Sequence, residues 1–140
     1  AKQVVALHSQ QAKQLNITLN LSVQSQQLVM IDRGQVEQVI INLLTNALDV
    51  LKQLNSPESA KCIEVSIAQN ANQQLYLEVS DNGTGISDHV IEMIFVPFFT
   101  TKQQGSGIGL SLSRQIMLNH GGDLVYIKRQ QGACFRCVFG

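Results

Sequence analysis

The sequence is poor in charge and has no apolar run long enough to cross a membrane. Only 14% of its 140 residues are charged, and ten Lys and Arg balance ten Asp and Glu, which gives a formal net charge of zero. This balance argues against a nucleic-acid binder with a broad basic face and against a polybasic membrane-surface module. No apolar stretch approaches the roughly 20 residues of a transmembrane helix, and no signal-peptide pattern opens the chain.

Cysteine is also scarce, and its three positions fit no disulfide framework. An odd number argues against a disulfide-stapled secreted fold and for a reduced, cytoplasmic setting. Cys134 and Cys137 have CxxC spacing, but they lie in a β-like segment, where residues three apart point to opposite faces. We therefore expect small core residues there, and neither a metal site nor a disulfide.

What is present suits one domain with one core, since 44% of the residues are apolar. The patterns predict helices over 2–14, 33–54, 87–93 and 107–119, with an irregular segment over 95–106. They predict strands over 16–23, 62–68, 74–80, 123–129 and 133–139. Val5, Ala6 and Leu7 form a weak stripe on the first helix, and Ser87 is the expected cap of the third.

The long second helix has the strongest pattern. Asp32 is its expected N-cap, with Gln35 three residues later. Its expected core face is Val36, Val39, Ile40, Leu43, Leu44, Ala47 and Leu51. Together with two predicted hairpins, over 62–80 and 123–139, this indicates an α+β two-layer sandwich and not the βαβ rhythm of a doubly wound domain.

Three polar or glycine-rich segments are candidates for chemistry. Asn42 and Asn46 share a stripe at the edge of the apolar face of the long helix. Their amide oxygens could support Mg²⁺, or the side chains could simply be exposed or bind neighbouring backbone groups. Asp81-Asn-Gly-Thr-Gly follows a strand and is either a ligand-binding turn or an ordinary turn. Gly105-Ser-Gly-Ile-Gly109 opens a helix, where backbone N–H groups suit phosphate, although it is neither a Rossmann nor a Walker loop.

The order and spacing of these segments indicate a protein family more specifically than any one segment does. Asn42-x3-Asn46, Asp81-x-Gly-x-Gly, Phe95-x-Pro-Phe-Phe-Thr-Thr-Lys102 and Gly105-x-Gly-x-Gly109 resemble the N, G1, F and G2 boxes of sensor histidine kinases. The wider family includes the ATPase domains of a heat-shock chaperone, DNA gyrase B and the mismatch-repair protein MutL. The resemblance runs from about residue 16 to residue 139 and implies a Bergerat-type ATP-binding fold, with a mixed, mostly antiparallel sheet covered by helices on one face.

The resemblance also implies a role for each matching residue. Asn46 would be the Mg²⁺ ligand, with Asn42 supporting it, and Asp81 would accept the adenine amine beside Gly83 and Gly85. The phosphates of ATP would meet the lid and the helix start, at Thr101, Lys102, Gly105, Gly107, Gly109 and Leu110. Asn42, Asn46 and Lys102 are the expected catalytic residues, and Phe95 and Phe98 would seat the lid; Lys102 could equally be a solvated loop lysine.

One position favours a kinase over a hydrolase. Hydrolysing relatives resemble Glu-x3-Asn in this helix, whereas Asn42 stands four residues before Asn46 and cannot act as a general base. Glu37 lies well off the Asn46 stripe. The γ-phosphoryl group is therefore expected to go to a histidine. A hydrolysing ATPase of the same family and a partner-binding module without nucleotide are the alternatives.

The acceptor histidine is not evident in this chain. His8-Ser-Gln-Gln lacks the acidic neighbour and the following proline of a phosphoacceptor. We therefore expect residues 1–15 to be a helix or link from a dimerisation domain and residues 16–140 to be the ATP-binding catalytic domain. The expected partners are a histidine-bearing dimerisation domain and, indirectly, a response regulator receiver domain. The fragment is expected to be monomeric and its parent a homodimeric inner-membrane sensor.

Overall fold

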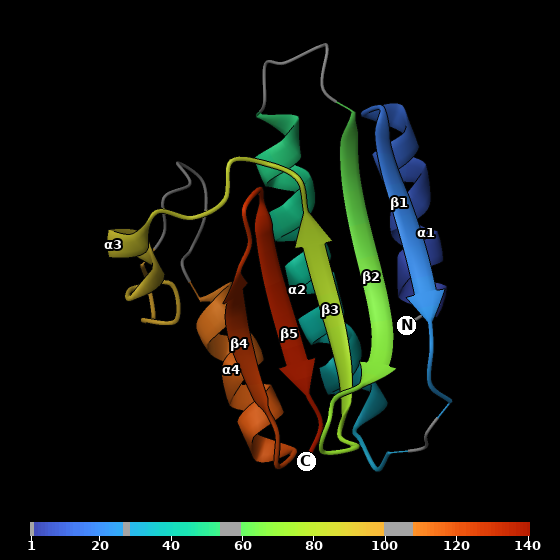
Figure 1. Cartoon of the computed structure of the whole chain (residues 1–140), viewed down its shortest axis with the longest axis vertical. Helices are drawn as coiled ribbons and strands as arrows, with labels where there is room; N and C mark the ends of the chain where they lie inside the picture. Colours follow the sequence, from blue (N-terminus) through green and yellow to red (C-terminus); the bar gives the residue numbers. More distant parts are fainter. Residues whose placement is uncertain (1, 27–28, 54–59, 100–107) are drawn as a thin grey trace.

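The computed structural model describes residues 2–26, 29–53, 60–99 and 108–140. Its helices are α1 (Lys2–Gln14), α2 (Arg33–Lys52), α3 (Asp88–Ile91) and α4 (Gly109–Asn119). Its strands are β1 (Ile17–Val23), β2 (Lys61–Gln69), β3 (Leu75–Asp81), β4 (Asp123–Lys128) and β5 (Ala133–Val138), as Figure 1 shows. The predicted elements are therefore present, with ends that differ by a few residues.

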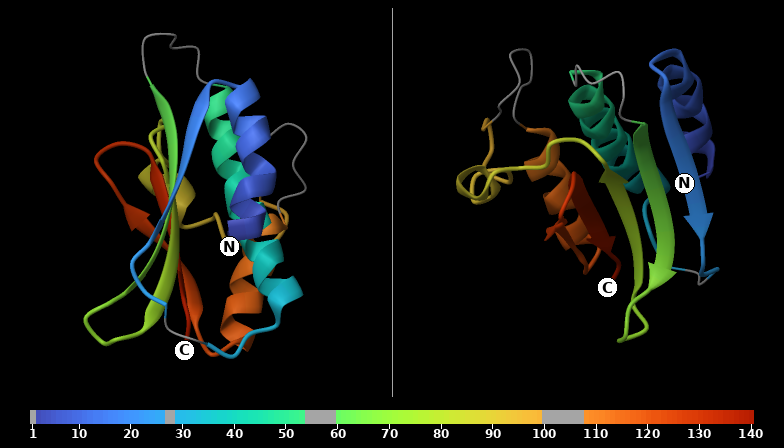
Figure 2. Two further views of the ribbon diagram at one scale, coloured as in Figure 1. Left: turned by 90° about the vertical axis from the view of Figure 1, so that its right-hand side faces the viewer. Right: turned by 45° about the horizontal axis from the view of Figure 1, so that its top comes forward.

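The strands form one mixed sheet in the order β1-β2-β3-β5-β4. β1 pairs with β2 in parallel, and the other three pairs are antiparallel. The helices α1, α2 and α4 lie on one face of this sheet, which gives the two layers visible in Figure 2. The predicted α+β sandwich, with its two hairpins β2–β3 and β4–β5, is confirmed.

The core lies between α2 and the sheet because α2 presents an apolar stripe at helical spacing. Every residue of its predicted core face is buried, and Leu48 joins them. Asp32 caps the helix as predicted, since its Oδ1 accepts the N–H of Gln35 at 3.0 Å. In the described part of the chain, no helix has the length and apolarity needed to span a bilayer.

Two expectations about the smaller helices are wrong. On α1 the buried residues are Val4, Val5 and Ala12, whereas Ala6 and Leu7 are exposed. The face of α1 is set by β1 and α2, against which it packs, and its short apolar run does not indicate that direction. The helix predicted over 87–93 is regular only over α3, and the Ser87 side chain makes no capping hydrogen bond.

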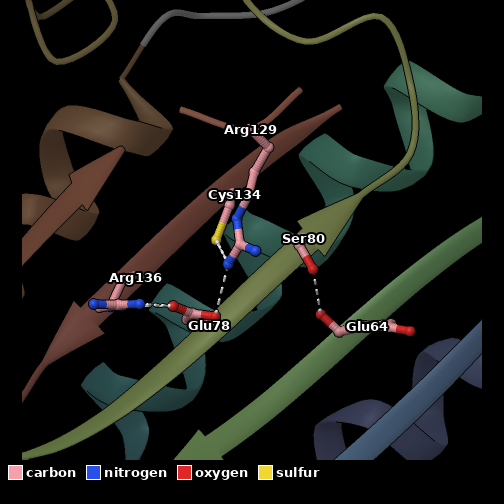
Figure 3. Close-up of polar contacts among 6 residues, drawn as sticks. All are labelled: Glu64, Glu78, Ser80, Arg129, Cys134 and Arg136. Carbon is pink, nitrogen blue, oxygen red and sulfur yellow. Dashed lines mark hydrogen bonds and ion pairs between the residues drawn. The ribbon is translucent and has the colours of Figure 1, made fainter. Parts of the chain in front are cut away.

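The opposite face of the sheet carries no helix among the described residues, and it holds a polar network that Figure 3 shows. Glu78 of β3 is buried there, with its Oε1 accepting from Nε of Arg136 at 2.6 Å and its Oε2 facing Nη2 of Arg129 at 3.3 Å. Arg129 also donates to Sγ of Cys134 at 3.5 Å. Cys134 shares this face whereas Cys137 lies in the helix-side core, so both are buried thiols on opposite faces, as predicted.

Candidate functional site

Asn42 joins α2 to the beginning of α4. Its Nδ2 donates to Oγ of Ser113 at 3.0 Å and lies 3.4 Å from the carbonyl oxygen of Gly109. Its Oδ1 accepts from Nε2 of Gln38, one turn earlier on α2, at 3.0 Å. Both ends of the Asn42 amide are therefore bound to protein groups, and the first turn of α4 lies directly beside the asparagine stripe of α2.

Asp81 ends β3, and its carboxylate organises the turn that follows. Oδ1 accepts the N–H of Gly83 at 2.9 Å and faces the N–H of Ala133 at 3.4 Å. No described residue donates to Oδ2. Burial raises the pKa of the Asp81 carboxyl above its ordinary value, although these two N–H groups oppose the shift. The arrangement leaves one carboxylate oxygen for an external donor such as an exocyclic amine.

The turn after Asp81 packs closely on α2. A Cβ on Gly83 would lie 2.7 Å from Cγ1 of Val50 and 3.0 Å from Oδ1 of Asp81, so only glycine fits there without displacing a neighbour. Gly85 lies in the same turn, and a Cβ on it would lie 2.9 Å from the carbonyl oxygen of Gly132. Gly83 and Gly85, the glycines predicted to line the adenine base, thus allow close contact between the turn, α2 and the residue before β5.

Asn46 lies on α2 between these two contacts. Residues 42, 46 and 50 are one helical turn apart, so they follow one stripe of the helix. The first turn of α4 meets this stripe at Asn42, and the Asp81 turn meets it at Val50. With a rise of about 1.5 Å per residue, the two contacts are about 12 Å apart along α2. The stripe therefore connects a turn suited to an amine with a helix start suited to an anion.

The beginning of α4 is not capped by a side chain. Its N-cap residue is Ile108, which makes no side-chain capping bond, in contrast to Asp32 at the start of α2. The N–H groups of a first turn have no partner within the helix and attract anions. Gly109 opens this turn, and a Cβ on it would lie 4.0 Å from Cγ of Asn42. Leu110, also a predicted phosphate contact, packs its side chain against the core.

Four predicted site residues lie outside the described residues: Thr101, Lys102, Gly105 and Gly107.

The two phenylalanines expected to seat the lid differ in their surroundings. Phe95 is half-buried, meets Phe135 edge-on at 6.5 Å and lies under the Arg114 guanidinium, 5.0 Å from its ring centroid. Phe98 is 78% exposed and has a φ of 70°. Phe95 therefore packs on the sheet and α4, whereas Phe98 makes no ring contact with the part of the chain that the structure describes.

The sequence did not single out Ser113, which the structure places at the centre of the α2–α4 contact with no exposed surface. A signal was available, because Ser113 is four residues after Gly109 and so shares its face of α4. Within the described ranges, no three His, Cys, Asp or Glu side chains are grouped so that they could share a metal ion.

Residues 31–139 match the family model described as histidine kinase-, DNA gyrase B- and HSP90-like ATPase. The chain is 39% identical over 127 residues to the sensor protein FixL of Bradyrhizobium diazoefficiens, which covers 89% of this chain and 24% of FixL. It is 45% identical over 114 residues to the two-component sensor PprA of Pseudomonas aeruginosa, covering 76% of this chain and 12% of PprA. The chain thus spans a quarter or less of these relatives.

Solved structures show the same fold. The nucleotide-free catalytic domain of the histidine kinase ThkA superposes with a TM-score of 0.81 at 30% identity, over 99% of this chain and 88% of that one. ThkA in complex with the response regulator TrrA gives a TM-score of 0.76 at 27% identity, over 99% and 38% of the two chains. The chain therefore belongs to the histidine kinase-, DNA gyrase B- and HSP90-like ATPase family, with the catalytic-domain fold of its sensor histidine kinases.

Proposed function

We propose that this chain binds Mg²⁺·ATP and donates the γ-phosphoryl group to a histidine of a dimerisation domain in two-component signalling. The observation that carries the proposal is the stripe on α2, which meets the Asp81 turn at Val50 and the uncapped start of α4 at Asn42. An adenine base at the first contact and phosphates at the second would place Asn46 between them. The relatives named above, which are sensors and histidine kinases, support the same reading.

The adenine end of the proposed site depends on Asp81. Its Oδ2 has no protein donor among the described residues, so it could accept the exocyclic amine. Gly83 and Gly85 keep the turn close to α2 and β5 and leave no side chain over the carboxylate. A carboxylate acceptor favours adenine over a base that carries a carbonyl in place of the amine, because two acceptors would then face each other.

The phosphate end would combine backbone and metal charge. Mg²⁺ prefers hard oxygen ligands, and it is commonly held by few protein groups together with phosphates and water. Asn46 supplies an amide oxygen of this kind, and Asn42 lies one turn away toward the start of α4. The glycine-rich segment with Gly105, Gly107 and Gly109, together with Thr101, Lys102 and the N–H of Leu110, would complete the phosphate contacts. Mg²⁺ would neutralise the negative charge of the ATP phosphates, which the chain, with its net charge of zero, does not balance.

Transfer to histidine is favoured over hydrolysis by what surrounds Asn46. The residue one turn before it is Asn42, whose amide cannot remove a proton from water. Glu37 is a carboxylate on the same helix, and it pairs with Nε of Arg33 at 2.8 Å. In the proposed reaction the bond from the γ-phosphorus to the bridging oxygen of ADP breaks, and a bond to an imidazole nitrogen forms. Positioning and charge neutralisation carry such a transfer.

The proposed partners follow from the same reading. The acceptor would be a dimerisation domain that precedes this domain in a homodimeric sensor, with residues 1–15 as the connection and residues 16–140 as the catalytic domain, monomeric by itself. A response regulator receiver domain would take the phosphoryl group next, as the complex of ThkA with a response regulator suggests. The domain would work in the cytoplasm on the inner side of a membrane-bound sensor.

Calorimetric titration with a non-hydrolysable ATP analogue and Mg²⁺ tests the proposal. The wild-type chain should bind, Asp81→Asn should lose most of the affinity, and Asp88→Asn, an exposed carboxylate on α3, should bind as wild type. Absence of binding to the wild type would leave a partner-binding module as the better description. Steady phosphate release that Asn46→Ala abolishes would indicate a hydrolase instead. With an added histidine-bearing dimerisation domain, acid-labile phosphate should appear on that domain.

A further inference from the structure

The contact between α2 and α4 contains a buried hydroxyl that is paired with a half-buried amide. Ser113 has no exposed surface, and its Oγ lies 3.0 Å from Nδ2 of Asn42. Apart from Glu78 on the other side of the sheet, Ser113 is the sole buried polar or charged residue in the described ranges. A buried hydroxyl in an otherwise apolar helix contact costs free energy unless a hydrogen bond offsets it, so this pair is a specific feature of the contact.

The surroundings of Asn42 fix which end of its amide faces α4. The carbonyl oxygen of Gly109 can only accept, so the group 3.4 Å from it must be the amide nitrogen. On the other side, Nε2 of Gln38 donates to Oδ1. The three side chains thus form a directed chain, in which Gln38 donates to Asn42 and Asn42 donates to Ser113. Reversal of the amide would place two donors against each other at Gln38 and two acceptors against each other at Gly109.

Gly109 and Ser113 are the first residue of α4 and the residue four positions later. The two acceptors of the Asn42 amide therefore lie at the beginning and at the end of the first turn of α4. A side chain that holds both ends of this turn fixes where its free N–H groups point relative to α2. This contact ties the beginning of α4 to α2, and the N-terminus of α4 has no side-chain cap of its own.

We propose that Ser113 is a positioning residue for the phosphate end of the site. Through its hydrogen bond it orients the Asn42 amide and holds the first turn of α4 at the height of Asn42 and Asn46 on α2. Ser113 itself touches neither phosphate nor metal. This inference rests on the proposed function, because it assigns Ser113 a part in holding the same nucleotide.

The test compares four variants of the chain in titrations with two ligands. The ligands are Mg²⁺ with a non-hydrolysable ATP analogue, and adenosine, which has the base but no phosphates. The variants are Ser113→Ala, Asn42→Ala, the double variant, and Ser111→Ala as the matched control. Ser111 is on the same helix and its hydroxyl bonds locally to the carbonyl oxygen of Ile108 at 3.1 Å.

Ser113→Ala should weaken binding of the Mg²⁺-bound analogue about tenfold and leave adenosine binding unchanged. Ser111→Ala should bind both ligands as wild type. In the Asn42→Ala background, Ser113→Ala should weaken binding no further, because Ser113 acts through Asn42. Equal losses for the two ligands, or no loss for either, would overturn the inference and leave Ser113 as a packing residue.

A second measurement does not depend on any serine variant being folded. In NMR spectra of the wild-type chain without nucleotide, the Asn42 side-chain amide protons should show nuclear Overhauser contacts to the Ser113 β protons. Addition of the Mg²⁺-bound analogue should shift those amide resonances, and adenosine should not. An Asn42 amide that neither contacts Ser113 nor responds to the analogue would refute the inference. If the wild-type chain binds no analogue at all, the proposed function fails as well, and the two failures are thereby distinguished.

Discussion

The Nε2 atom of His120 accepts a hydrogen bond from the backbone N–H of Asp32 at 3.0 Å, and so joins the end of α4 to the start of α2. The other ring nitrogen, Nδ1, lies 2.8 Å from the carbonyl oxygen of Ile116 and donates to it. The imidazole is therefore bound on both sides in one neutral tautomer. Asn42 and Ser113 make a second polar connection between these helices, near the other end of α4.

Replacement of His120 by alanine should remove this connection. The variant loses two side-chain hydrogen bonds and leaves the Asp32 N–H to find water, whereas the Ile116 carbonyl keeps its bond from the backbone N–H of residue 120. We therefore expect the free energy of unfolding to fall by about 1–2 kcal/mol. Denaturant unfolding measures the change. His89→Ala, at an exposed position on α3, is the control and should change stability by less than about 0.5 kcal/mol. Equal stability of the two variants would show that the His120 bonds contribute nothing.

The Asp81 carboxylate should be needed for nucleotide binding and should also lower the stability of the fold. Burial raises the pKa of its carboxyl, so its contribution to stability is complete below the unfolded pKa of about 3.9 and is lost as pH rises through the folded pKa. At neutral pH the ionised carboxylate therefore destabilises the nucleotide-free fold. Asp81→Asn removes this effect and keeps an oxygen for the Gly83 N–H. We expect the variant to melt at a higher temperature than wild type at pH 7 while it binds adenine nucleotides less well.

The pH dependence provides the check. The stability advantage of Asp81→Asn over wild type should be absent near pH 3, should grow as pH rises above 4 and should become constant above the folded pKa. Asp88→Asn is the matched control, because Asp88 and its partner Lys128 are both largely exposed and such pairs contribute little. A constant difference between Asp81→Asn and wild type across this range would contradict the assigned shift.

A substitution at Gly132 would measure how much the fold depends on the close approach of the turn before β5 to Asp81. Its φ is +80°, and a Cβ there would lie 1.8 Å from the carbonyl oxygen of Asp81, which is backbone and cannot move aside. We expect Gly132→Ala to lower the free energy of unfolding by more than about 3 kcal/mol. Gly121 has nearly the same φ, +78°, but the nearest atom to its Cβ would be 4.0 Å away.

The comparison of these two glycines separates backbone conformation from contact. Gly121→Ala should cost only about 1 kcal/mol, the amount typical of a left-handed residue that gains a Cβ. Thermal or denaturant unfolding of both variants under identical conditions gives the answer. Similar losses for the two would mean that the close approach of Gly132 to Asp81 is readily relieved.

Local patterns in the sequence predicted what depends on near neighbours. The apolar spacing of α2, its cap at Asp32 and the end of α4 at residue 119 are set within a few residues, and all are present. α4 ends in a Schellman motif, in which the Gly121 N–H donates to the Leu118 carbonyl and the Gly122 N–H donates to the Met117 carbonyl.

Contacts between distant residues could not be predicted in this way. Asn42 was recognised as a site residue, but its partners Gly109 and Ser113 are 67 and 71 residues away, and nothing near Asn42 indicates them. The same holds for Asp32 and His120, which are 88 residues apart. On α1, the buried face depends on where β1 and α2 lie, so a short apolar run indicated Ala6 and Leu7 where Val4 and Ala12 are buried.

The polar network around Glu78, on the face of the sheet opposite to α1, α2 and α4, should stabilise the fold without affecting the nucleotide site. Glu78 pairs with Arg129 and Arg136, and Arg136 also lies over the Tyr76 ring, 4.4 Å from its centroid. Glu78→Ala leaves two cations facing each other, which should cost about 2 kcal/mol of unfolding free energy, since the arginines remain partly hydrated. Glu64→Ala, an exposed change on the same face, should cost less than about 0.5 kcal/mol. Both variants should bind the Mg²⁺-bound ATP analogue as wild type does, and weaker binding by Glu78→Ala would link the two faces of the sheet.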